Sequence, residues 1–79
     1  MNKKASDSDF RSIRMSTIDI GQAIDGLEAR AEAYERTADY LDGKPSSEIF
    51  LAEEVSHSRE ARAIARHFRA IIAVLEKAR

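Results

Sequence analysis

A glutamate and a histidine stand three residues apart, at Glu54 and His57. On an α-helix this spacing puts a carboxylate and an imidazole on one face, as in the bundles that hold two iron or manganese ions. Such a site needs further carboxylates from facing helices, and so short a motif often arises by chance. We therefore expect Glu54 and His57 to form a polar patch with Tyr34. Metal binding is the less favoured alternative, and we predict no bound metal or cofactor.

The sequence Ser56-His57-Ser58 brings two hydroxyls beside an imidazole. Adjacent residues of a helix point in different directions, so this run does not align a nucleophile with a base. The chain contains no cysteine, which excludes a thiol nucleophile, a thiolate zinc site and a disulfide. Phosphate-binding and dinucleotide-binding glycine motifs are also missing from the sequence. These observations predict a protein that is not an enzyme.

Four arginines follow one another at spacings of three, four and three residues: Arg59, Arg62, Arg66 and Arg69. On a helix they form a guanidinium stripe that can bind an acidic protein surface or nucleic-acid phosphates. The segment from Asp19 to Asp42 is acidic, with Asp19, Asp25, Glu28, Glu32, Glu35, Asp39 and Asp42. The stripe is therefore either an internal partner for these acids or a binding surface. We predict a protein partner, with nucleic acid as the alternative.

The composition describes a chain of 79 residues with 43% apolar and 34% charged residues and a net charge of −1. A chain this apolar is not disordered, and none of its apolar runs approaches the ~20 residues of a membrane span. Residues 1–8 are polar and are not followed by the apolar stretch of a signal peptide. We expect a disordered terminus over 1–8, no membrane association, and a cytoplasmic protein.

Apolar residues recur at alternating steps of three and four along most of the chain, which predicts amphipathic helices. The first series predicts a helix from about residue 9 to residue 42, capped by Ser6 or Ser8. Gly43 and Pro45 predict a turn over 43–46, and a second helix follows over about 47–78. Residues 9–79 are thus expected to form a single domain.

The two apolar series match when the second helix folds back across so short a turn. Leu41 then faces Phe50, Ala31 faces Ala61, and Ile24 faces Phe68. In the same register Tyr34 faces His57. The predicted fold is therefore all-α, a hairpin of two long antiparallel helices.

A two-helix unit of this size rarely builds a sufficient core by itself, so the apolar residues beside the main series need a partner. A second copy supplies one most simply, giving a four-helix bundle. The interface predicted for it comprises Leu51, Val55, Ala65, Ile72 and Ile18. We expect a homodimeric interaction module, such as an adaptor, an inhibitor or a chaperone-like protein.

Overall fold

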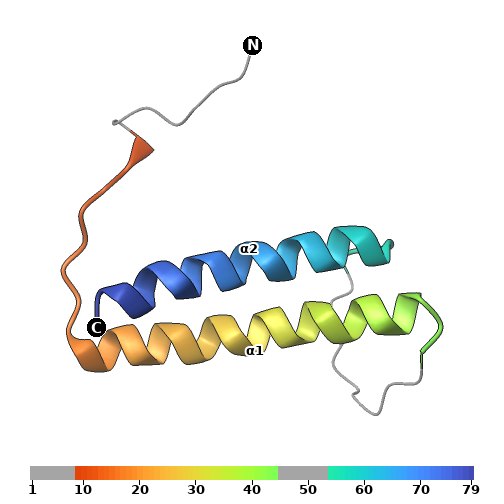
Figure 1. Cartoon of the computed structure of the whole chain (residues 1–79), viewed down its shortest axis with the longest axis horizontal. Helices are drawn as coiled ribbons and strands as arrows, with labels where there is room; N and C mark the ends of the chain where they lie inside the picture. The colour runs from red at the N-terminus through yellow and green to blue at the C-terminus, as the bar shows by residue number, and fades with distance from the viewer. Residues whose placement is uncertain (1–8, 45–53) are drawn as a thin grey trace.

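The computed structural model describes residues 9–44 and 54–79. They contain two α-helices, α1 (Thr17–Leu41) and α2 (Ser58–Lys77), which lie side by side and run in opposite directions (Figure 1). Within these two ranges the regular structure is helical, which confirms the predicted all-α class and the antiparallel hairpin. Neither described helix combines the length and the hydrophobicity that a membrane span requires.

Helix α1 begins at Thr17, so the predicted start at about residue 9 is wrong. Ser16 is the N-cap, and its hydroxyl accepts a hydrogen bond of 3.0 Å from the backbone N–H of Asp19. Phe10 and Ile13, which the prediction placed in the helix, are 64% and 76% exposed. Because α2 ends at Lys77, no helix of the hairpin faces these residues, and packing cannot support another helical turn there. The predicted caps Ser6 and Ser8 lie outside the described residues.

The end of α1 follows the sequence prediction, since Gly43 terminates the helix. Gly43 has a φ of +86°, the left-handed conformation that a residue without a Cβ adopts at little cost. Its N–H donates to the carbonyl of Tyr40, and the N–H of Lys44 donates to the carbonyl of Asp39. These two bonds form a Schellman motif, which satisfies carbonyl groups that a helix end would otherwise leave unpaired.

Helix α2 begins at Ser58, whereas the sequence predicted a start at about residue 47. Residues 55–57 precede the helix, and His57 is its N-cap residue with an extended backbone. Polar residues such as Ser56 and Ser58 favour helix starts over helix interiors, which fits this boundary. The remainder of the predicted turn and helix start, residues 45–53, falls outside the described residues.

The core lies between the two helices and consists of two clusters. The cluster near the connection contains Ala31, Tyr34, Ala38, Val55, Ala61 and Ala65, and the other contains Ile20, Ile24 and Ile72. Val55, Ala65 and Ile72 are thus buried within one chain, which corrects the prediction that they face a second copy. Ile18 is 74% exposed, as an interface residue must be in the free chain. Leu51 is outside the described residues.

The register of the two helices also differs from the predicted one. The ring of Tyr34 packs against Phe68 with ring centroids 5.8 Å apart, whereas the prediction placed Tyr34 against His57 and Phe68 against Ile24. Relative to α1, α2 is therefore displaced by roughly two to three helical turns. The connection between the helices is longer than predicted, and a heptad repeat presents a similar apolar pattern after each shift of seven residues. The periodicity alone could not distinguish these registers.

Candidate functional site

Arginines of α2 and acids of α1 share one side of the hairpin, which we call the charged flank; it comprises Glu35, Asp39, Asp42, Arg59, Arg62, Arg66 and Arg69. Arg62 spans two acids, with its Nη2 at 2.7 Å from Asp42 Oδ2 and at 3.3 Å from Asp39 Oδ1. The hydroxyl of Ser58 and the guanidinium of Arg62 hold the pKa of Asp42 below its usual value. This group joins the last turn of α1 to the first turns of α2.

Arg69 binds Glu35 through two nitrogens. Its Nε lies 2.8 Å from Glu35 Oε2 and its Nη2 lies 2.9 Å from Glu35 Oε1. Arginine holds a carboxylate in this fork geometry and lysine cannot, so the contact fixes orientation as well as charge. The hydrogen bonds from Arg69 lower the pKa of Glu35, and those to Glu35 raise the pKa of Arg69.

Arg59 and Arg66, unlike Arg62 and Arg69, are not paired with acids of α1. Both side chains are exposed, and neither forms an ion pair within residues 9–44 and 54–79. Helical spacing explains the difference, because Arg62 and Arg69 border the core whereas Arg59 and Arg66 point further outward. The stripe is thus divided, with Arg62 and Arg69 in the internal pairing that the sequence allowed and Arg59 and Arg66 left on the surface.

The half of α1 further from the connection carries acids with fewer partners. Among the described residues, Asp25 and Glu28 form no ion pair, and Glu32 reaches Arg36 only at 4.0 Å. Helical spacing places Glu28 and Glu32 in line with Glu35 and Asp39, so they extend the acidic side of the charged flank, whereas Asp25 points further away from α2. The flank therefore carries exposed positive charge on α2 and exposed negative charge on α1.

A second polar group ties the segment before α2 to the middle of α1. The hydroxyl of Tyr34 donates to Glu54 Oε2, and Arg30 Nη2 donates to the same hydroxyl at 3.1 Å. Arg30 also stacks over the ring of Tyr34 and lies 3.7 Å from Glu54. The bond to Glu54 raises the pKa of Tyr34, and the bond from Tyr34 lowers that of Glu54. The predicted contact of Tyr34 with Glu54 is therefore present.

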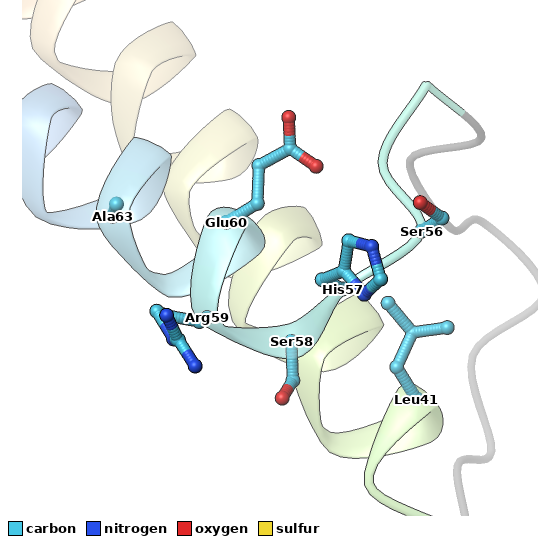
Figure 2. Close-up of a pocket in the computed structure, with 7 residues that line it drawn as sticks. All are labelled: Leu41, Ser56, His57, Ser58, Arg59, Glu60 and Ala63. Atoms are coloured by element: carbon cyan, nitrogen blue, oxygen red, sulfur yellow. The ribbon is translucent and has the colours of Figure 1, made fainter.

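The start of α2 borders a solvent-open hollow lined by Leu41, Ser56, His57, Ser58, Arg59, Glu60 and Ala63 (Figure 2). His57 caps the helix through its backbone and makes no side-chain cap bond. The Ser58 hydroxyl helps to lower the pKa of Asp42, so it lies close to the end of α1. The residues that line this hollow therefore mark the start of α2.

The expectation that Glu54 and His57 share one helical face is wrong. Glu54 lies in a turn and His57 precedes the first residue of α2, so the helical spacing on which a di-metal site depends does not exist here. Glu54 instead binds Tyr34 and Arg30. Among the described residues, no three histidine, aspartate or glutamate side chains gather closely enough to hold a metal ion.

Sequence reasoning found the arginine stripe and the Tyr34–Glu54 contact but missed the pairing of Arg69 with Glu35. The spacing of the acids and the arginines predicts that ion pairs form between the helices. Which acid pairs with which arginine depends on how α2 is aligned along α1. No protein-family model, curated protein or solved structure matches the chain. The charged flank and the apolar side chains that the hairpin leaves exposed are thus the features on which a function can be based.

Proposed function

We propose that this chain is a small non-enzymatic interaction module that binds an acidic surface of another protein and also associates with a second copy of itself. The observation that carries the first part is the exposure of Arg59 and Arg66 beside two arginines that are already paired. Since Arg62 and Arg69 already pair with acids of α1 and the core lies elsewhere, Arg59 and Arg66 can bind a partner while the hairpin stays folded.

The arrangement of charge on the flank supports a protein partner. Arg59 and Arg66 lie two helical turns apart, about 10 Å, and project from the same side of α2. Guanidinium groups bind carboxylates in a fixed geometry, and an exposed charged patch speeds the encounter with a partner of opposite charge. The acids of α1, such as Asp25 and Glu28, would orient that partner by repelling its acidic groups. The expected surface therefore carries carboxylates opposite α2 and none opposite α1.

Nucleic acid is the less favoured partner for the same reason. A phosphate backbone is negative along its whole length, and it would meet Glu32, Glu35 and Asp39 beside the arginines. Two of the four arginines already have carboxylate partners. The flank therefore opposes a continuous polyanion more than it opposes a protein with localised acidic groups.

Self-association is supported by the apolar residues that remain uncovered. Ile18, Tyr40 and Val74 are 74%, 55% and 68% exposed. Several core residues are small, among them Ala31, Ala61 and Ala65, and a two-helix unit buries a limited area. A second hairpin that covers part of this surface would add to the core. The four-helix bundle expected from the sequence remains part of this proposal.

Replacing Arg59 and Arg66 together by glutamate tests the protein-binding role. We expect the R59E/R66E variant to lose the proteins that the wild-type chain captures from its own cell extract, while its circular dichroism spectrum stays helical. Arg14 provides the control, since it is exposed and lies before α1. The R14E variant should keep those proteins. Capture of the same set by R59E/R66E would contradict the proposal.

A further inference from the structure

The side of α2 that faces away from α1 carries cations but no acids. We call it the outer face of α2, and its exposed members include Arg59, Ala63, Arg66, Ala70, Val74 and Lys77. Ala61, Ala65 and Ile72 mark the opposite, buried side of the helix. The two acids of α2, Glu60 and Glu76, lie at the borders of the outer face. A partner that lies along this face therefore meets positive charge from α2 and no negative charge.

The three cations of the outer face, Arg59, Arg66 and Lys77, are available to a partner. Within residues 9–44 and 54–79 none of them forms an ion pair, whereas Arg62 and Arg69 are paired with acids of α1. From Arg59 to Lys77 the row of cations is about 27 Å long. Carboxylates that reach all three must be spread over a comparable length of the partner.

Small side chains lie between the cations. Ala63 stands between Arg59 and Arg66, and Ala70 stands between Arg66 and Val74. Alanines allow another helix to approach α2 closely, while the long side chains of the cations reach past the contact to its carboxylates. Val74 is 68% exposed and adds apolar area. We infer that the outer face of α2 binds an acidic helix of another protein, which lies lengthwise along α2 with its carboxylates opposite the three cations.

The hollow at the start of α2 continues the outer face. Arg59 and Ala63 belong to both, and Leu41 at the end of α1 contributes to the lining (Figure 2). Leu41 is 37% exposed, so an apolar side chain near one end of the partner helix can contact it while a neighbouring carboxylate binds Arg59. A phosphate backbone gains nothing from Leu41, Ala70 or Val74. These apolar contacts favour an acidic helix over nucleic acid.

The inference rests on the proposed binding of an acidic protein and names the element of the partner that binds. The probe is an alanine-rich helical peptide whose glutamates lie on one face, spaced to match the three cations. A peptide of the same composition with its helix broken by a central proline is the control. We expect the wild-type chain to bind the helical peptide at least about tenfold more tightly in calorimetry. Equal binding of the two peptides, or tighter binding of duplex RNA, would overturn the inference.

Variants of the outer face test where the peptide binds. K77E should weaken binding of the helical peptide by about tenfold, because it places like charges opposite each other, and R14E is the matched control. A70F should also weaken it by holding the two helices apart, whereas A29F, at an exposed alanine of α1, should not. The R59E/R66E/K77E variant should instead bind a peptide with lysines in place of the glutamates. Unchanged binding of the glutamate peptide by this variant would contradict the inference.

The inference and the proposed function can fail separately. If R59E/R66E loses its captured proteins while K77E and A70F bind the helical peptide as the wild type does, the acidic surface of the partner is compact. That result would overturn the inference and leave the proposed function intact. If R59E/R66E keeps its captured proteins, the proposed function itself is wrong.

Discussion

At the scale of single residues, the contact between Arg69 and Glu35 illustrates what the sequence determines and what it leaves open. The spacing of the four arginines predicts a stripe, and the acids of the first helix predict partners for it. Which arginines are paired depends on the rotation and the register of α2, and both follow from packing. Arg62 and Arg69 therefore differ from Arg59 and Arg66, although all four look equivalent in the sequence.

The lowered pKa of Glu35 predicts how stability depends on pH. The folded chain holds the pKa of Glu35 below its ordinary value of 4.5, so the contact stabilises the fold above that pH. Its contribution is lost as the pH falls and Glu35 becomes protonated in the folded state. We expect the free energy of unfolding, measured by urea denaturation between about pH 3 and pH 7, to decrease at the acidic end.

Two arginine variants separate this contact from the general effect of charge. R69Q removes the partner of Glu35, so its stability should depend less on pH than that of the wild type. R66Q removes an equal charge from an exposed site without an ion pair in the described chain, and it should keep the wild-type dependence. Equal pH profiles for R69Q and R66Q would contradict this role of Glu35.

At the scale of the helices, the ends of α1 show which boundaries a sequence reveals. Gly43 was predictable because the left-handed conformation at a helix end strongly favours glycine. The start at Thr17 was missed although Ser16 and Asp19 form a recognisable capping pair, because Phe10 and Ile13 continue the apolar spacing. Periodicity shows that a segment can form an amphipathic helix. Whether it does so depends on a facing surface, and α2 ends too early to supply one.

Replacement by alanine should have opposite effects on stability at Gly26, within α1, and at Gly43, just after it. A Cβ at Gly26 meets no atom within 4 Å, so G26A should raise the free energy of unfolding by about 1 kcal/mol through helix propensity. Gly43 has a positive φ, so G43A should lower it by about 1 kcal/mol or more. Chemical denaturation of both variants checks this. A gain in stability for G43A would mean that the turn at the end of α1 is not left-handed.

At the scale of the whole molecule, the fold class and the antiparallel arrangement followed from the sequence, and the register did not. The apolar pattern repeats every seven residues, so several alignments of the two helices bury similar side chains. The structure selects the one that brings Tyr34 to Phe68 and Arg62 to Asp42. In the structure Val55, Ala65 and Ile72 lie in the core of one chain, and Ile18 stays on the surface. The predicted interface therefore changed although the predicted fold held.

The central claim is that one hairpin is an incomplete unit that associates with a second copy. Native mass spectrometry of the untagged chain over a range of concentrations tests it most directly. We predict a species of twice the chain mass that dissociates on dilution and carries no metal. A chain that remains monomeric at every concentration would contradict the claim, and it would leave the exposed side chains of Ile18 and Tyr40 to a different protein.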